Sequence, residues 1–120
     1  MNTKTIADLI DHTLLKQDTT HSEVIQLCED AMKYQFASVC IPPYYVREAS
    51  NALESQKGNV KVSTVVGFPL GYSSVLAKVE EIKKAIHEGA DEIDAVLNIC
   101  AIKNEDWGFV RNEIDSLVLG

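Results

Sequence analysis

Several kinds of feature are scarce in this sequence of 120 residues. There are three cysteines, Cys28, Cys40 and Cys100, and because they form no CxxC or CxxH pattern we expect neither a disulfide framework nor a metal site. Basic residues are outnumbered, 11 Lys and Arg against 18 Asp and Glu, so the net charge is −7. The sequence therefore predicts no nucleic-acid surface and no membrane partner. No apolar run approaches the roughly 20 residues of a membrane span.

The composition that remains is that of an ordinary globular protein, with 46% hydrophobic and 24% charged residues. A chain of this length can bury a core, and we expect a single domain over residues 1–120. The first residues lead into an amphipathic segment and lack the apolar core of a signal peptide. Together with the scattered cysteines, this predicts a reduced, cytoplasmic setting.

Strand and helix signals alternate four times along the chain. Apolar segments that predict strands begin near residues 11, 37, 61 and 91, and a short helix over 4–10 precedes the first of them. Each strand is followed by apolar residues at helical spacing. This alternation is typical of a parallel sheet with crossover helices, so the predicted fold class is α/β.

The helices have recognisable signals. Thr20 and Glu23 have the spacing of a capping box, and Pro43 can open a helix that Gly58 closes. A loop is predicted through residues 103–104. The apolar faces predicted for the two helices on either side of the last strand are Val75, Val79, Ile82 and Ile86, and Trp107, Val110, Ile114 and Leu117.

The segment 89–98, Gly-Ala-Asp-Glu-Ile-Asp-Ala-Val-Leu-Asn, predicts a strand entered from a helix. Taken alone it also fits a half-exposed antiparallel strand. In a parallel sheet both faces are covered, so its polar face must point into a site, a barrel interior or an interface. A carboxylate in such a place is costly unless it is paired or used. That polar face carries Glu92, Asp94, Val96 and Asn98.

Four segments carry a family resemblance. They are Ile-Asp-His-Thr-Leu-Leu-Lys at 10–16, Ala-Ser-Val-Cys-Ile-Pro-Pro at 37–43, Val-Val-Gly-Phe-Pro-Leu-Gly at 65–71, and the segment 89–98. In order and spacing they resemble the deoxyribose-phosphate aldolases, class I aldolases on a (β/α)₈ barrel. The resemblance implies the amino-terminal half of a TIM barrel, with four parallel βα units after a short helix.

The resemblance also implies an activity. The family are cytoplasmic lyases of deoxyribonucleotide catabolism that reversibly cleave 2-deoxyribose 5-phosphate to acetaldehyde and glyceraldehyde 3-phosphate. They act through a lysine Schiff base, without cofactor or metal. Asp94 matches the family's general acid/base, and Asp11 matches an aspartate that holds a second lysine charged. From the residues alone, Asp11 also fits an N-cap or turn position. Five residues match the wall of the substrate pocket, although core packing explains them equally well: Thr13, Leu15, Cys40, Val65 and Phe68.

This sequence departs from the family pattern in its lysines. Lys16, Lys61, Lys83 and Lys103 match neither lysine motif, and the barrel loops that bind phosphate after strands 7 and 8 have no counterpart. We therefore expect the isolated chain to have little or no aldolase activity.

Two other functions remain open. One is a catalytically inactive half-barrel that self-associates through its exposed sheet edges, most simply as a homodimer. Its uncovered inner face would include Val39 and Ile41 or their neighbours, Val62 or Ser63, and Val96. The other is a phosphoacceptor receiver, which would need a fifth βα unit, clustered acids at the first strand end and a late lysine.

Overall fold

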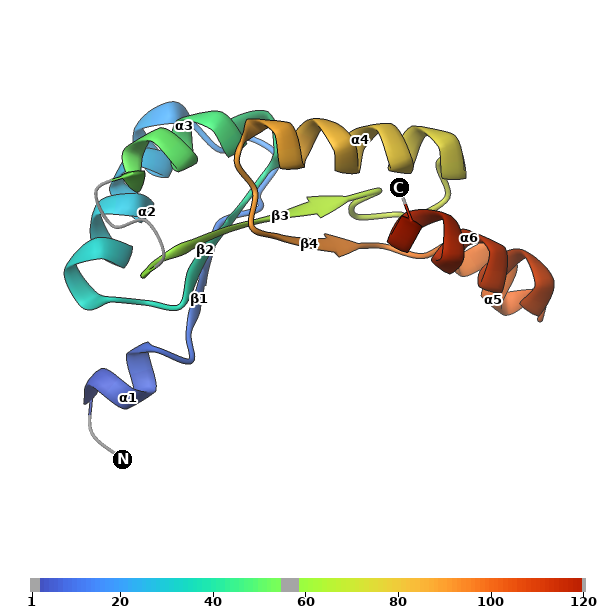
Figure 1. Ribbon diagram of the computed structural model, residues 1–120, viewed down its shortest axis with the longest axis horizontal. Helices are drawn as coiled ribbons and strands as arrows, with labels where there is room; N and C mark the ends of the chain where they lie inside the picture. Colours follow the sequence, from blue (N-terminus) through green and yellow to red (C-terminus); the bar gives the residue numbers. More distant parts are fainter. Residues whose placement is uncertain (1–2, 55–58, 120) are drawn as a thin grey trace.

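The computed structural model describes residues 3–54 and 59–119, and its strands form one sheet in the order β1-β2-β3-β4. Every neighbouring pair is parallel (Figure 1). The predicted sheet order is confirmed, and the antiparallel interpretation of residues 89–98 is wrong. The strands are β1 (Asp11–Thr13), β2 (Ser38–Ile41), β3 (Lys61–Val66) and β4 (Glu92–Ala95).

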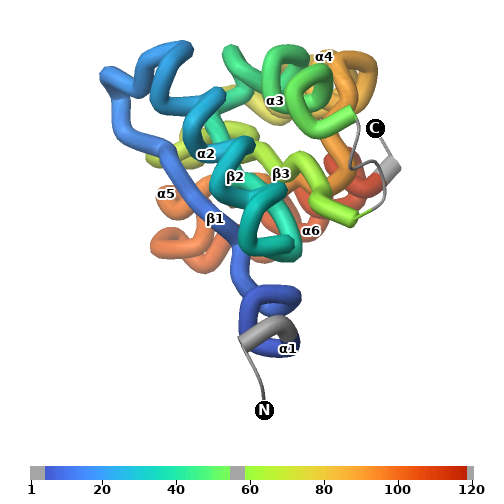
Figure 2. The backbone as a smooth tube through the Cα atoms, turned by 90° about the vertical axis from the view of Figure 1, so that its left-hand side faces the viewer, coloured from blue at the N-terminus to red at the C-terminus, as the bar shows by residue number. Residues whose placement is uncertain are grey.

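Helices alternate with these strands. In Figure 1, α3 and α4 lie over one face of the sheet, and Figure 2 shows α1 projecting from the body of the molecule. The radius of gyration is 15.6 Å, above the roughly 13.6 Å of a compact domain of this length. The helical elements are α1 (Thr3–Ala7), α2 (His21–Tyr34), the 3₁₀ turn η1 (Pro43–Tyr45), α3 (Val46–Ala52), α4 (Val75–Glu88), α5 (Ile99–Lys103) and α6 (Trp107–Leu119).

The helix termini follow the local sequence. The Thr20 hydroxyl accepts from the Glu23 N–H, and the Glu23 carboxylate accepts from the Thr20 N–H, which confirms the capping box. Pro43 opens the 3₁₀ turn that leads into α3, as predicted. The predicted helix end at Gly58 lies outside the described residues. Gly89 ends α4 at φ 113°, where a Cβ would lie 2.3 Å from the Ser50 Oγ.

One predicted loop is a helix. Residues 99–103 form α5, because the Asn98 side chain accepts a hydrogen bond from the Ala101 N–H and caps the turn. In the sequence Asn98 continues the polar face of the predicted strand. Its second role as the cap of α5 is not visible there, and the helix is therefore missed. The chain therefore turns sharply at the carboxyl end of β4.

The hydrophobic core lies between the sheet and the helices on one side. Val39 and Ile41 of β2 and Val62 of β3 contribute to it, and each is at most 3% exposed. Successive strand residues point to opposite faces, so Cys40 and Ser63 lie on the other face. This decides which residues line the inner face of the sheet. From the helical side the core takes Val24, Leu27, Cys28, Ala31, Val46 and Ala49.

The buried face of α4 differs from the predicted one. It carries Lys78, Ile82 and Ala85, whereas Ile86 is 57% exposed. The face of α6 is also turned, because Glu113 is fully buried while Trp107 and Ile114 are 58% and 41% exposed. The physical reason is an ion pair between Lys78 and Glu113 that lies in the contact between the two helices.

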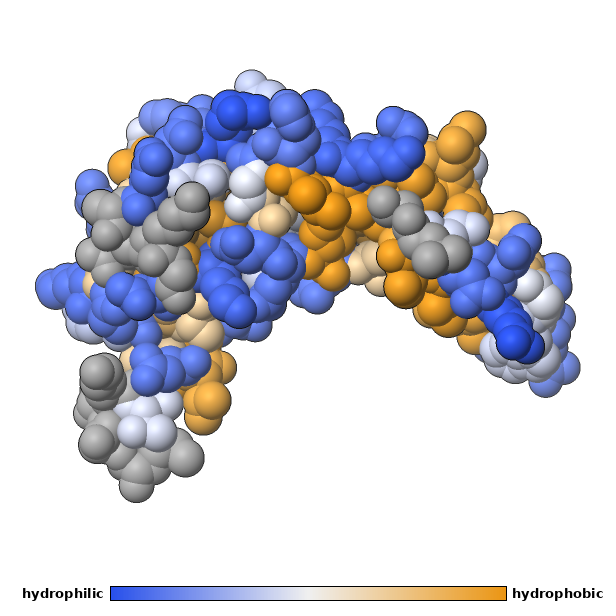
Figure 3. Space-filling model, viewed as in Figure 1, coloured by the Kyte–Doolittle hydropathy of each residue, from blue (hydrophilic) through white to orange (hydrophobic). Residues whose placement is uncertain are grey.

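The molecule is arched rather than spherical. Its principal extents are 45 × 32 × 27 Å. Figure 3 shows hydrophobic residues gathered beneath α4 and beside α6, above an underside that is hollowed between the two ends. One face of the sheet is therefore packed against helices. The other face is not covered along its whole width by any element of the described residues.

Adjacent serines before α4 test the capping argument. Ser74 accepts from the Ala77 N–H, so we expect Ser74→Ala to lower the free energy of unfolding by about 1 kcal/mol. Ser73 is exposed and its side chain caps no helix in the described part of the chain, so Ser73→Ala is the matched control and should change the free energy of unfolding by less than about 0.5 kcal/mol. Urea titration followed by circular dichroism measures both. Equal losses in the two variants would show that Ser74 does not act as the cap.

Candidate active site

Side chains on the uncovered face of the sheet line up in rows across the strands. The strand register places Thr13 beside Cys40, Cys40 beside Ser63, and Ser63 beside Glu92. In the next row Val65 lies beside Asp94. Because neighbouring strands are about 4.8 Å apart, the members of a row are within contact range of one another. The structure thus brings five predicted site residues together on one face: Asp11, Thr13, Cys40, Val65 and Asp94.

The two acidic residues of β4 on this face differ in their surroundings. Glu92 lies 3.8 Å from the Lys61 ammonium and accepts a long hydrogen bond, 3.5 Å, from the Ser63 hydroxyl. The Asp94 carboxylate is exposed, and within residues 3–54 and 59–119 no group donates a hydrogen bond to it. Asp94 is therefore the carboxylate of this strand that is available to a ligand or a water.

Asp11 begins β1 and is held by its neighbour. Its Oδ1 accepts a hydrogen bond of 2.7 Å from the Ser38 hydroxyl, the residue opposite it on β2. The interpretation of Asp11 as a helix N-cap or turn residue is therefore wrong. The hydrogen bond fixes the carboxylate on the same face as Thr13, while its exposed side remains open to a cation.

The Cys40 thiol lies close enough to Asp11 and Asp94 to be affected by both charges. Burial raises the pKa of the Cys40 thiol, and the negative charges of Asp94 and Asp11 raise that pKa further. A charge on β1 and a charge on β4 thus both act on one side chain of β2. Cys40 is 6% exposed, and because its pKa is raised the thiol stays neutral and is a poor nucleophile.

A pocket of about 490 Å³ lies beyond the carboxyl ends of the first three strands. Leu15, Val65 and Phe68 line it, three of the residues predicted as pocket wall, and Lys16 stands at its edge. β1 ends at Thr13, so Leu15 belongs to the loop that forms this pocket. Thr13 and Cys40 are not part of its lining. Val65 joins the pocket to the row that contains Asp94.

The loop 67–71 carries Phe68 and is held from both ends by α4. The Gly67 N–H donates to Glu81 at 2.9 Å, and the Gly71 carbonyl accepts from the Lys78 ammonium at 2.6 Å. Gly71 has φ 77°, and a Cβ there would lie 2.2 Å from the Leu97 carbonyl oxygen. The exit of β3 and the exit of β4 are therefore in direct contact.

Sequence reasoning missed Lys78, Glu81 and Glu113. The signal available for Lys78 was its position four residues before Ile82, on the side of the helix that is buried. Glu113 has the same relation to Leu117. Each position alone fits a solvated charge, and only their pairing across two helices identifies them as buried.

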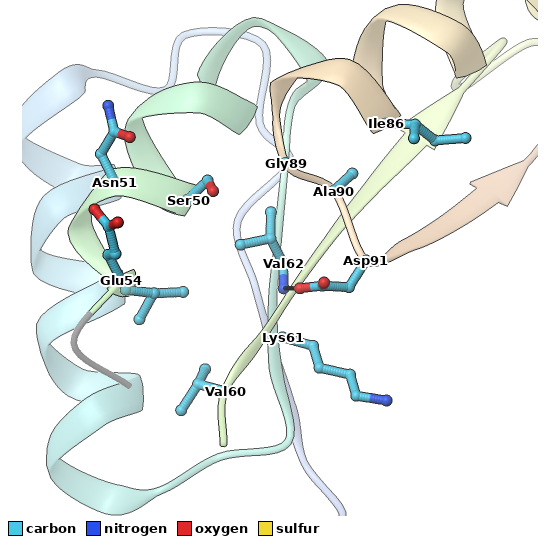
Figure 4. Close-up of a pocket in the computed structure, with 11 residues that line it drawn as sticks. Ser50, Asn51, Glu54, Val60, Lys61, Val62, Ile86, Gly89, Ala90 and Asp91 are labelled. Carbon is cyan, nitrogen blue, oxygen red and sulfur yellow. Dashed lines mark hydrogen bonds between the residues drawn. The ribbon is translucent and has the colours of Figure 1, made fainter. Parts of the chain in front are cut away.

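A second pocket, of about 420 Å³, lies near the amino ends of β3 and β4, the edge opposite Asp94 (Figure 4). Asp91 is the acidic residue beside the strands there, and its carboxylate accepts from the Val62 N–H at 2.9 Å. The Asp91 N–H in turn donates to the Val62 carbonyl. This carboxylate thus secures the start of β4, and the pocket holds none of the predicted site residues.

The histidines and the helices give no sign of other chemistry. His12 and His21 lie near Asp30 and Glu48 respectively, far apart in the sequence and on separate elements. Among the described residues no three His, Cys, Asp or Glu side chains are grouped so that they could hold a metal ion. In the same part of the chain no helix has the length and apolar character needed to cross a membrane.

Comparison with known proteins gives a consistent result. A family model described as DeoC/LacD family aldolase matches residues 5–117. A deoxyribose-phosphate aldolase of Caldicellulosiruptor saccharolyticus is 48% identical over 118 residues, which is 98% of this chain and 53% of the relative. One of Shouchella clausii is 51% identical over 113 residues, 94% of this chain and 50% of the relative. The chain thus spans about half the length of the curated relatives it matches.

Solved structures agree. A crystal structure from Coccidioides immitis, described as a deoxyribose-phosphate aldolase, superposes with a TM-score of 0.93 at 37% identity, covering 99% of this chain and 46% of its own. The deoxyribose phosphate aldolase of Aeropyrum pernix, described as tetrameric, gives 0.77 at 29% identity, covering 97% and 50%. The four βα units are half of a TIM barrel, as predicted.

Cysteine alkylation tests the geometry around Cys40. With the exposed Cys100 replaced by Ser, we expect Cys40 to react slowly with iodoacetamide at pH 8, and Asp94→Asn to speed the reaction. The sign follows from the charge: losing the carboxylate lowers the pKa of the thiol and so increases the reactive thiolate. Glu80→Gln, on the exposed side of α4, is the control and should have no effect. An unchanged rate in Asp94→Asn would place Asp94 away from Cys40.

Proposed function

Because the chain belongs to the DeoC/LacD aldolase family, we propose that its uncovered sheet face is the acid/base half of a deoxyribose-phosphate aldolase site. The observation that carries this proposal is the free Asp94 carboxylate beside Val65, and Val65 lines the pocket together with Leu15 and Phe68. Active sites of (β/α)₈ barrels lie at this carboxyl edge of the strands. The paired state of Glu92 supports assigning the proton transfers to Asp94.

In the proposed reaction a lysine amine condenses with the C1 aldehyde of open-chain 2-deoxyribose 5-phosphate and releases water. The bond between C2 and C3 then breaks, the C3 hydroxyl loses its proton, and the electron pair passes into the imine. Asp94, acting through a water, takes that proton and returns one to C2. Hydrolysis of the imine releases acetaldehyde, after glyceraldehyde 3-phosphate has left. Asp11 would hold a second lysine in its charged form.

Lys16 and Lys78, two lysines of the described part of the chain, do not suit the imine-forming role. Lys16 is the one at the pocket, and its hydrogen bond and ion pair with Glu23 raise its pKa, whereas an imine-forming lysine needs an uncharged amine at neutral pH. Lys78 is buried and its ammonium is committed to Glu113 and the Gly71 carbonyl. We therefore propose that the isolated chain supplies the acid/base residues without the nucleophile, and is inactive or nearly so.

Borohydride trapping tests this assignment. After incubation with acetaldehyde and reduction, we expect mass spectrometry to find no stoichiometric adduct on any one lysine of this chain, and a retro-aldol assay to find at most a trace of activity. The Caldicellulosiruptor saccharolyticus relative, treated in the same way, controls for the chemistry of trapping. One lysine of this chain fully converted to the reduced adduct would refute the proposal.

We also infer that the chain self-associates as a homodimer, with a second copy as the occupant of its open edges. Within the described residues, β1 pairs only with β2 and β4 only with β3, so both outer strands present unpaired backbone groups. Exposed apolar side chains lie on the segment before β1 and on α6, and a two-fold arrangement would bring the two sets together without forming a fibre. Beside β1 they are Ile6, Leu9 and Ile10, and on α6 they are Ile114 and Val118.

Charge opposes this closure and makes it dependent on pH. Asp11, Glu92 and Asp94 of both copies would face one interior, and protonating them removes the repulsion. We expect sedimentation velocity at tens of micromolar to show a dimer that strengthens from pH 8 to pH 5. Asp94→Asn should weaken this pH dependence, and the exposed Glu80→Gln should not. A monomer throughout would rule out the dimer, and association that strengthens with rising pH would rule out the charge argument.

A further inference from the structure

Lys78 and Glu113 form an ion pair whose two side chains are both 0% exposed, the only charged residues buried in the described part of the chain. The Lys78 ammonium lies 2.8 Å from the Glu113 Oε2. Each partner also binds one backbone group: Lys78 donates to the Gly71 carbonyl at 2.6 Å, and the Glu113 Oε1 accepts from the Asn98 N–H at 2.8 Å. The ion pair between α4 and α6 is thus linked by hydrogen bonds to a backbone group beyond β3 and to another beyond β4.

Stability alone does not account for this pair. Removing two charges from water is costly, and apolar residues of similar volume in place of a buried ion pair often leave stability unchanged or improve it. The distinctive feature of Lys78 and Glu113 is therefore what they bind. The Gly71 carbonyl and the Asn98 N–H lie just beyond the carboxyl ends of β3 and β4, where the sheet no longer supplies partners.

The two strand exits carry the candidate site. Phe68, in the loop that ends at Gly71, lines the pocket, and Asp94 stands four residues before Asn98. The exits also touch, since a Cβ on Gly71 would lie 2.2 Å from the Leu97 carbonyl oxygen and 2.7 Å from the Val96 side chain. A shift of either exit would consequently move the pocket wall relative to the acid/base carboxylate.

We propose that Lys78 and Glu113 are positioning residues that hold the Phe68 loop and the end of β4 in a fixed position relative to each other. The importance of this fixed position for catalysis rests on the proposed function, because in the contacts above the ion pair touches neither the pocket nor Asp94. The relative position of the loop and the strand end is a property of the free chain and can be measured without a substrate.

The experiment compares three variants. Lys78→Met leaves Glu113 charged and buried, so its Tm should fall by roughly 10 °C or more. The double variant Lys78→Met/Glu113→Leu removes both charges, and its Tm should return to within roughly 5 °C of the parent. Lys84→Met on the same helix is the matched control, because Lys84 pairs with Glu88 at the surface and its loss should change the Tm little.

Two readouts separate positioning from packing in the double variant. The Asn98 amide loses its acceptor, so its hydrogen exchange should accelerate by at least about tenfold relative to the parent. The pH profile of Cys40 alkylation should also move to lower pH, because the thiol senses the charges of Asp94 and Asp11 and the end of β4 is released. A double variant with parental Tm, parental Asn98 exchange and a parental Cys40 profile would overturn the proposal.

The unmodified chain provides a test that does not depend on any variant folding. The Asn98 amide should exchange as slowly as the amides of β2 and β3, although it lies outside the sheet. Exchange as fast as that of the exposed Ser73 amide would overturn the proposal whatever the variants show. Since no readout uses a substrate, failure of the aldolase assignment would leave these results intact, and failure here would leave the aldolase assignment standing.

Discussion

The pairing of four parallel strands in chain order is the constraint on which the rest of this structure depends. Side chains alternate between the two faces of a strand, so one register assigns every strand residue to a face. Val39, Ile41 and Val62 go to the helices and form the core. Their neighbours form rows on the other face, where Asp94 meets Val65. The helix-packed core therefore fixes the geometry of the candidate site.

The same constraint explains how acidic residues are tolerated here. An apolar core on one side stabilises the sheet, and the opposite face needs no apolar residue of its own while it remains open to water. Each acid on that face is then distinguished by its neighbours: Ser38 holds Asp11, and Lys61 and Ser63 hold Glu92. Asp94 has no such partner among the described residues, which is why it is the one assigned to proton transfer.

Much of this could be read from the sequence, because it depends on local signals. The strand order follows from four repeats of strand and helix, and the start of α2 follows from Thr20 and Glu23. The missing parts depend on contacts between distant segments. Lys78 and Glu113 are 35 residues apart, and in the sequence each has the character of an ordinary surface residue. Only their contact in the folded chain shows that they are buried. Asn98 belongs by pattern to a strand, and only its bond to the Ala101 N–H shows that it starts a helix.

We propose that this chain carries the acid/base side of an aldolase site. The decisive experiment joins the chain to the part of the Caldicellulosiruptor saccharolyticus relative that the chain does not match. We expect this fusion to cleave 2-deoxyribose 5-phosphate, with kcat lowered roughly 10²–10⁴-fold by Asp94→Asn and far less by Glu92→Gln. A fusion whose kcat is unaffected by Asp94→Asn would contradict the proposal.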